Sequence, residues 1–282
     1  MDLKLVEKIK EWGRCLPELN AWYLSFSPLS LMSEILVWKL NYEIRDYGVL
    51  FYNNRTSYLL PLTSDKKLYV KWLLEVMKEK RERIDCVPNW CAEYMKSKWI
   101  CSVNLTDKDF INSTKEMIEM RWKKFRTIRY YIGKLLQKNN TEIVEINEKN
   151  KNLFLECNAE RYRKKQDTVF RLYFRKEIEC SINNYEMLKE HFNVKWLWVY
   201  SEWKIIWFVF GDVICDNCWW CVFHRRSDFD EPWLWHYMHH ILAKEYETYE
   251  LENYWWATIS WLKSLKTRIW VGMLNSFTLL RN

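Results

Sequence analysis

The amino-acid sequence predicts an α+β protein made of two related modules, each a mostly antiparallel, twisted sheet flanked by helices. Three aromatic-rich runs at 196–200, 205–210 and 219–223 are separated by short polar breaks, and they fit consecutive strands better than helices. Acidic residues and Pro232 then mark the start of a helix. Because residues 1–115 also combine helices with short strands, a second α+β unit is expected there.

Length and composition limit the class of protein. The chain has 282 residues, enough for two ordinary domains, and its 49% hydrophobic residues provide material for a core. No apolar run approaches the roughly 18–20 residues of a membrane span, and the charged amino terminus lacks the apolar segment of a signal peptide. Nine scattered cysteines suit reduced thiols. We therefore expect a cytoplasmic protein without a transmembrane segment, whose net charge of +7 permits an anionic partner.

The residue pattern predicts the remaining elements by hydrophobic periodicity and turn signals. In the first half these are a helix within 1–20, a helix at 31–40, strands at 41–45, 49–52 and 57–61, and helices at 69–82 and 116–138. In the second half they are helices at 154–166 and 169–189, the strands within 195–226, a helix at 232–247, a strand at 254–257, a helix at 259–267 and a strand at 268–274. We divide the chain into an N-terminal domain at 1–115, a connecting basic helix at 116–140 and a C-terminal domain at 141–282.

The predicted helix at 119–138 carries seven basic residues around an apolar stripe. Such a face is either an ordinary solvated surface or a surface that contacts phosphates. Tyr130 and Tyr131 lie among these basic residues, and Tyr162 lies in a second basic group at 161–165. Aromatic rings in this setting can stack on bases, which favours a nucleic-acid partner.

Several familiar site motifs are excluded. Cys215, Cys218, Cys221 and His224 have a metal-like spacing, but side chains alternate along a strand, so that Cys221 would point away from Cys218 and His224. The trio of His236, His239 and His240 lacks the glutamate of an H-E-x-x-H motif. Five widely spaced glycines exclude phosphate-binding and dinucleotide loops, and no G-x-S-x-G elbow is present. We expect no metal site.

Four segments resemble the double-GNAT branch of acyltransferases, which includes the FemABX aminoacyltransferases and the cytosolic domain of phosphatidylglycerol lysyltransferases. They are SFSPLSLMSEILVWKL at 25–40, KKFRTIRYYIGKL at 123–135, KIIWFVFGDVI at 204–214 and WLKSLKTRIW at 261–270. The resemblance implies two tandem GNAT-like modules, with the active site in the C-terminal one. It also implies transfer of an acyl or aminoacyl group.

The resemblance assigns roles to individual residues. It places Arg129 at the family's arginine, Gly211-Asp212 at its glycine–acid pair, and Lys263 and Lys266 at the basic positions of its closing segment. The chain departs from the pattern just before that segment. Where the family has an acidic residue and glycines, this sequence has Trp256, Thr258 and Trp261, unless a shift in register makes Glu252 and Asn253 equivalent.

The start of the helix at 232–247 bears on the identity of the donor. In acetyl-CoA-dependent GNAT enzymes, backbone N–H groups at this helix start bind the pyrophosphate. Here residues 227–232 carry three carboxylates, which would repel a pyrophosphate, and Pro232 lacks an N–H group. Acids at a helix start are also ordinary capping residues. The pattern disfavours acetyl-CoA and favours an aminoacyl-tRNA donor, whose amino group is cationic; no cofactor is firmly expected.

The leading hypothesis is acyl or aminoacyl transfer to an amine or hydroxyl acceptor, with backbone N–H groups near 223–225 stabilising the oxyanion. Candidate catalytic residues are the acids Asp212, Asp228 and Glu252, and candidate substrate-binding residues are Arg129, Arg225, Asn253, Lys263 and Lys266. The acceptor is left open between a lipid head group reached by peripheral membrane contact, a peptide amine and a modified base. Two alternatives are an acetyl-CoA-dependent N-acetyltransferase and a non-catalytic module that binds nucleic acid or protein.

Overall fold

A computed structural model provides the structure of this protein. It describes residues 3–281 apart from 13, 16–27, 55–56, 80–82, 99, 138–140, 164–168, 202–203, 217, 226–233 and 255–271. Within these residues the strands join into one eleven-stranded sheet with the order β1-β2-β3-β4-β11-β5-β10-β9-β8-β7-β6. The strands are β1 (Asn41–Arg45), β2 (Gly48–Tyr52), β3 (Ser57–Pro61), β4 (Arg83–Pro88), β5 (Cys101–Ser113), β6 (Thr141–Glu145), β7 (Lys195–Ser201), β8 (Lys204–Cys215), β9 (Cys218–Arg225), β10 (Leu251–Tyr254) and β11 (Gly272–Arg281).

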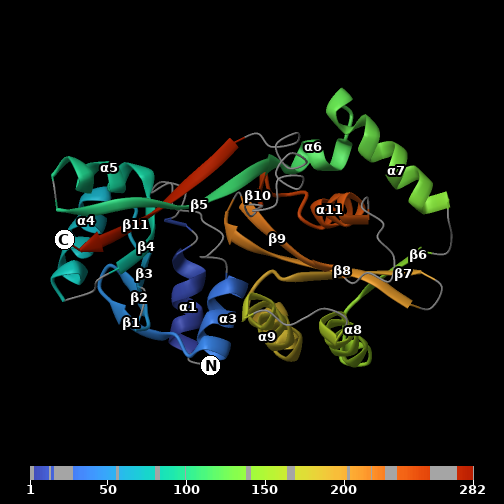
Figure 1. The fold of residues 1–282 in the computed structure, drawn as a ribbon, viewed down its shortest axis with the longest axis horizontal. Helices are drawn as coiled ribbons and strands as arrows, with labels where there is room; N and C mark the ends of the chain where they lie inside the picture. Colours follow the sequence, from blue (N-terminus) through green and yellow to red (C-terminus); the bar gives the residue numbers. More distant parts are fainter. Residues whose placement is uncertain are drawn as a thin grey trace.

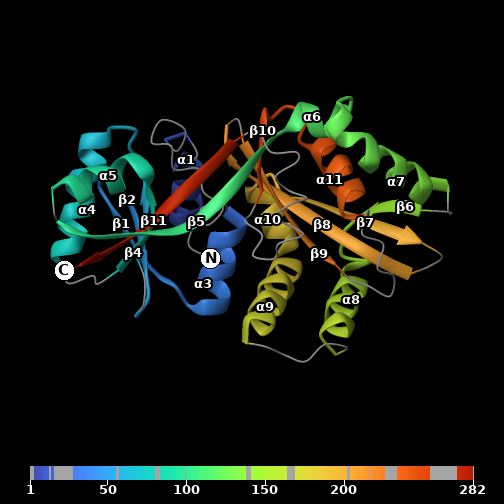
Figure 2. The ribbon, with the colours of Figure 1, turned by 45° about the horizontal axis from the view of Figure 1, so that its top comes forward.

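Helices cover both faces of this sheet. They are α1 (Leu3–Trp12), α3 (Pro28–Trp38), α4 (Lys66–Lys78), α5 (Asn89–Ser97), α6 (Thr114–Glu119), α7 (Arg126–Gln137), α8 (Lys151–Arg163), α9 (Val169–Asn183), α10 (Tyr185–His191) and α11 (Leu234–Glu245), with a short 3₁₀ turn η2 (Lys123–Phe125). Figures 1 and 2 show α6, α7 and α11 on one side of the C-terminal part of the sheet, and α8 and α9 on the other.

The two halves of the chain repeat one order of elements. The first half runs β1-β2-β3-α4-β4-α5-β5, and the second runs β7-β8-β9-α11-β10 before reaching β11. In each half one pair of strands is parallel, β3 with β4 and β9 with β10, whereas the other pairs are antiparallel. The predicted architecture of two related, mostly antiparallel modules is confirmed.

The halves exchange their final strands at the centre of the sheet. β5 pairs with β10 of the second half, and β11 pairs with β4 of the first half. β5 and β11 also pair with each other, from Gly272 opposite Ile111 to Arg281 opposite Cys101. The division at 141–282 placed the last strand in the C-terminal domain, but β11 lies between β4 and β5, where both of its edges find hydrogen-bonding partners. The division itself stays a prediction.

The expected strands at 41–45, 57–61 and 195–226 are confirmed. The single helix at 116–138 is wrong, because Met120 takes a left-handed conformation (φ 47°) that ends α6 before α7 begins. The strand expected at 254–257 is β10 at 251–254, and the strand expected at 268–274 is described as β11 at 272–281. The helix expected at 259–267 lies outside the described residues.

Two buried clusters lie on opposite sides of β8. Phe208, Phe210 and Ile214 belong to the larger cluster, which also includes residues of α1, α3, α4 and α9. Val209 belongs to the smaller cluster, formed with α6, α7 and α11, and Val213 packs against it. Since side chains alternate along a strand, Asp212 shares the face of Phe210 and Ile214.

Candidate active site around the parallel strand pair

The parallel pair of β9 and β10 is the central feature of the C-terminal half. The described register has three positions, from Leu251 opposite Cys218 to Asn253 opposite Trp220. β9 then continues to Arg225, still paired with β8. Five residues of β9 therefore extend beyond its described pairing with β10.

The sheet register places the candidate acids in two different rows. Asp212 lies opposite Trp220, which lies opposite Asn253 on β10. The neighbouring row contains Trp219 and Glu252. Because successive rows belong to opposite faces of a sheet, the positions of Asp212 and Asn253 share one face and the position of Glu252 belongs to the other. Asp212 and Glu252 are therefore not brought together on one face.

Asp212 is fully buried, with 0% of its surface exposed. It lies on the face of β8 that packs against the larger core cluster, and α3 contacts this strand. Removing a carboxylate from water is costly unless hydrogen bonds or opposite charges compensate for the loss of hydration. An acid kept at such a position beside the parallel strand pair is a functional candidate.

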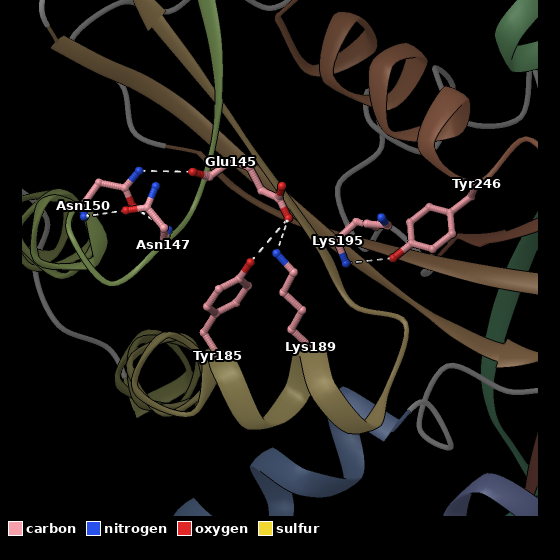
Figure 3. Close-up of polar contacts among 7 residues, drawn as sticks. All are labelled: Glu145, Asn147, Asn150, Tyr185, Lys189, Lys195 and Tyr246. Carbon is pink, nitrogen blue, oxygen red and sulfur yellow. Dashed lines mark hydrogen bonds and ion pairs between the residues drawn. The ribbon is translucent and has the colours of Figure 1, made fainter.

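Tyr246 holds the backbone next to Asp212. Its hydroxyl oxygen lies 2.5 Å from the Gly211 carbonyl oxygen and 2.8 Å from the Asn193 carbonyl oxygen, so it donates to one of them at a time. The same oxygen accepts a hydrogen bond of 3.0 Å from the backbone N–H of Lys195, as Figure 3 shows. Tyr246 thus connects the end of α11 to β7 and β8.

A second cluster of polar side chains, also drawn in Figure 3, connects β6 to α10. The Lys189 ammonium lies 3.1 Å from a Glu145 carboxylate oxygen, and the Tyr185 hydroxyl donates to the same oxygen at 3.4 Å. Hydrogen bonds with Tyr185 and Glu145 raise the pKa of Lys189 to about 12. Asn150 also donates to the backbone carbonyl of Glu145. These contacts fix the edge of the sheet.

Arg129, a predicted substrate-binding residue, lies in α7 at the α6–α7 turn. Its guanidinium donates to the backbone carbonyls of Met120 and Trp122. These two carbonyls flank the turn that the left-handed Met120 creates. Arg129 therefore stabilises the connection between α6 and α7.

The histidines of α11 have structural contacts where they are described. His240 Nδ1 lies 3.0 Å from the Met117 carbonyl oxygen and joins α11 to α6. Burial lowers the pKa of His240 below its ordinary value. His239 is buried, and the side chain of His236 is outside the description. Cys215 and Cys218 lie opposite each other in the β8–β9 hairpin. Among the described side chains no group of three forms a potential metal site.

Several predicted site residues lie outside the description. Asp228, Trp256, Thr258, Trp261, Lys263 and Lys266 fall within the undescribed ranges 226–233 and 255–271. Arg225, Glu252 and Asn253 are placed by backbone register alone. Sequence reasoning missed Tyr246, because a tyrosine near the end of a helix carries no signal that its hydroxyl will contact two other strands.

Comparison with known proteins identifies the fold. No protein-family model and no curated protein sequence matches this chain. Among solved structures, a protein of unknown function from Bacteroides thetaiotaomicron aligns with a TM-score of 0.82 at 17% identity, covering 100% of this chain and 98% of its own. L-PGS from Bacillus licheniformis aligns with a TM-score of 0.66 at 13% identity, over 98% and 91% of the two chains, and FemX with a TM-score of 0.61 at 10% identity, over 95% and 94%.

The chain has a double-GNAT fold. At these identities the similarity concerns the fold, and the repeated order of elements described above agrees with it. In this double-GNAT protein β9 and β10 are the parallel pair of the second module, and β3 and β4 are the parallel pair of the first. No helix within the described ranges is long and apolar enough to cross a membrane.

Proposed function

We propose that this double-GNAT protein transfers an aminoacyl group from an aminoacyl-tRNA to an amine or hydroxyl acceptor. The observation that carries the proposal is the parallel β9–β10 pair beside a fully buried acid, in a chain with the fold of L-PGS and FemX.

The reaction requires an acceptor held close to an activated carbonyl. An acceptor amine attacks the ester carbonyl, a C–N bond forms, the ester C–O bond breaks, and the proton of the amine passes to the departing ribose oxygen. Such a reaction gains most of its rate from positioning and from stabilising the oxyanion. Alternate N–H groups of a strand point to opposite edges, so the part of β9 from 221 to 225 supplies at least two N–H groups on the β10 side. We assign the oxyanion contact to this segment.

Asp212 is the acid we assign to orienting the cationic amino group of the donor or the neutral, attacking amine of the acceptor. It lies in the row of Trp220 and Asn253, across β9 from β10. Tyr246 supports it indirectly, since its hydroxyl contacts the carbonyl of the preceding residue, Gly211. A rigid backbone on one side of a buried carboxylate limits the positions that the carboxylate can take.

The choice of an aminoacyl-tRNA over acetyl-CoA is supported by the sequence before α11. Residues 227–232 carry three carboxylates and a proline, a composition that opposes pyrophosphate binding. The acceptor is proposed by class alone. A lipid head group, a peptide amine and a modified base each provide a suitable nucleophile.

Mixing the purified protein with a pool of aminoacylated tRNA tests the donor. We expect faster loss of the aminoacyl ester than in buffer, and no saturable binding of acetyl-CoA by calorimetry. Tight acetyl-CoA binding together with unchanged ester lifetimes would contradict the donor assignment. A second reaction uses tRNA that carries a labelled aminoacyl group, in cell extract. Separating lipids, peptides and nucleosides afterwards shows which class of molecule has received the label, and this identifies the acceptor class.

A further inference from the structure

The outer face of α7 is a basic and aromatic surface away from the sheet. Arg126, Tyr130 and Lys134 are four residues apart and therefore lie on one face of the helix. Tyr130 is 55% exposed, and the Lys134 ammonium lies 4.8 Å from the centre of its ring. Figures 1 and 2 show α7 at the periphery of the molecule, at the end opposite α4 and α5. We call Arg126, Tyr130 and Lys134, with Gly133 between them, the α7 ridge.

The surroundings of the α7 ridge have a strong excess of positive charge. Residues 114–137 contain seven basic and two acidic residues. Both acids already have ion-pair partners, Glu116 with Lys124 at 2.5 Å and Glu119 with Arg121 at 3.7 Å. Neither of these acids therefore neutralises a basic residue of the ridge itself.

Gly133 gives an independent indication of a close partner. A Cβ atom at this position would meet nothing within 4 Å, so packing within the described chain does not require glycine. Glycine in a helix interior costs about 1 kcal/mol relative to alanine. One use of such a residue is to let a ligand or another backbone approach closely. Gly133 lies between Tyr130 and Lys134 in the ridge.

The partner that fits best is RNA rather than a lipid bilayer. A helix that inserts into a membrane interface needs an exposed apolar face. The apolar stripe of α7 includes Ile128 and Ile132, which are buried in the smaller core cluster, and among the described residues of this helix Leu136 is the one aliphatic side chain that is exposed. The ridge instead offers cations at helical spacing and an exposed ring, and Trp122 is 61% exposed beside the turn held by Arg129. Cations that follow a phosphate backbone and rings that stack on bases are typical of RNA-binding surfaces.

We propose that the α7 ridge docks the phosphate backbone of structured RNA, namely the body of the donor tRNA at a distance from its reactive end. This inference rests on the proposed function for the identity of the RNA. α7 and α6 both contact α11, the helix between β9 and β10. The body of a donor bound to the ridge would thus lie on the α11 side of the sheet, and its reactive end would pass the β9–β10 pair to reach Asp212 on the opposite face.

The test measures binding of fluorescently labelled, uncharged tRNA at several salt concentrations. The double variant Tyr130→Ala, Lys134→Ala should bind about tenfold more weakly, with a salt dependence reduced by roughly one unit for the lost phosphate contact. The matched control is Tyr94→Ala, Lys98→Ala. Tyr94 lies on α5 and Lys98 directly follows this helix, where its ammonium also lies over an exposed tyrosine ring, at 6.0 Å. This control variant should bind tRNA like the parent.

Gly133→Ala provides a variant that should fold at least as well as the parent, because a Cβ atom at this position meets nothing within 4 Å. Alanine should raise the melting temperature because it favours the helix, and it should weaken tRNA binding because its methyl group lies where the backbone of the RNA approaches. Equal binding by the parent and all three variants would overturn the docking surface. Binding to vesicles of anionic phosphatidylglycerol that is lost in the ridge variant, without tRNA binding, would also overturn it and identify a membrane surface.

Two donors of different length distinguish the docking role of the α7 ridge from the transfer reaction itself. With an aminoacylated minihelix that contains only the acceptor stem, the ridge variant should react like the parent, whereas with full-length aminoacyl-tRNA it should react more slowly at low donor concentration. Equal rates for the parent and the ridge variant on both donors would remove the docking role and leave aminoacyl transfer intact. Absence of transfer by the parent, with salt-dependent tRNA binding through the ridge, would remove the proposed function alone.

Discussion

The hydroxyl of Tyr246 contacts the carbonyl of Gly211, the residue directly before the fully buried Asp212. A side chain at the end of α11 thereby fixes the backbone of β8 at the candidate acid. The same hydroxyl accepts the N–H of Lys195, where β7 begins. The Tyr246 hydroxyl therefore connects α11, the helix that follows β9, to β8, the strand that carries Asp212.

Replacing Tyr246 with Phe should lower the free energy of unfolding by about 1–3 kcal/mol, because the buried carbonyl of Gly211 and the partly buried N–H of Lys195 lose a hydrogen-bonding partner. Chemical denaturation measures the change. Tyr249→Phe is the matched control, since its hydroxyl accepts from the exposed side chain of Asn193 at 3.2 Å. An equal loss of unfolding free energy in both variants would show that the contact of Tyr246 with Gly211 does not contribute more to stability than the exposed contact of Tyr249.

Replacing Arg129 with Lys should destabilise the fold by about 1–2 kcal/mol, because an ammonium group cannot reproduce the guanidinium contacts with the Met120 and Trp122 carbonyls. Arg126→Lys, on the outer face of the same helix, should leave the free energy of unfolding unchanged. Thermal unfolding of the two variants makes the comparison. An Arg129→Lys protein as stable as the parent but weak in donor binding would instead support the substrate-binding role that the family resemblance implies.

The exchanged strand β11 should depend on a buried contact with β4. Thr278 on β11 donates to the carboxylate of Asp85, and the Arg83 Nε atom lies 2.9 Å from both oxygens of that carboxylate. Thr278→Val should cost about 1–3 kcal/mol in the free energy of unfolding because Asp85 is buried. Thr63→Val, which removes an exposed contact to the Asp65 N–H, is the control. Equal losses would show that this contact does not hold β11.

Stability should fall as the pH decreases below about 6.5, the ordinary pKa of histidine. Burial lowers the pKa of His240 in the folded protein, so the unfolded chain binds a proton that the folded chain does not, and the stability present above the unfolded pKa is lost as pH falls towards the folded value. His240→Gln should have a smaller slope of unfolding free energy against pH in this range. Denaturation curves at a series of pH values that show the same slope for both proteins would contradict the role of His240.

The local pattern of the sequence was sufficient for the strands at 41–45, 57–61 and 195–226, because apolar and β-branched residues run between clear turn signals. It was insufficient for β11, whose place between β4 and β5 depends on pairing with residues more than 160 positions away. The break at Met120 was missed as well, since methionine rarely adopts the left-handed conformation and a distant arginine supports it here.

Only part of the candidate site could be predicted from the sequence. Gly211 and Asp212 stood out through a family resemblance, and the structure places Asp212 in the core beside the parallel strand pair. The separation of Asp212 from Glu252 into different rows could not be predicted, because it depends on a strand register that local patterns do not specify.

The most direct test of aminoacyl transfer follows a labelled aminoacyl group from tRNA in a single-turnover reaction. The parent protein should accelerate its loss from tRNA and pass the label to an acceptor in cell extract. Asp212→Asn should retain the circular dichroism spectrum of the parent and transfer the label at least tenfold more slowly, as expected when a positioned acid in a reaction of this kind is lost. Ester lifetimes equal to those in buffer, with every aminoacylated tRNA pool and every extract, would contradict the account.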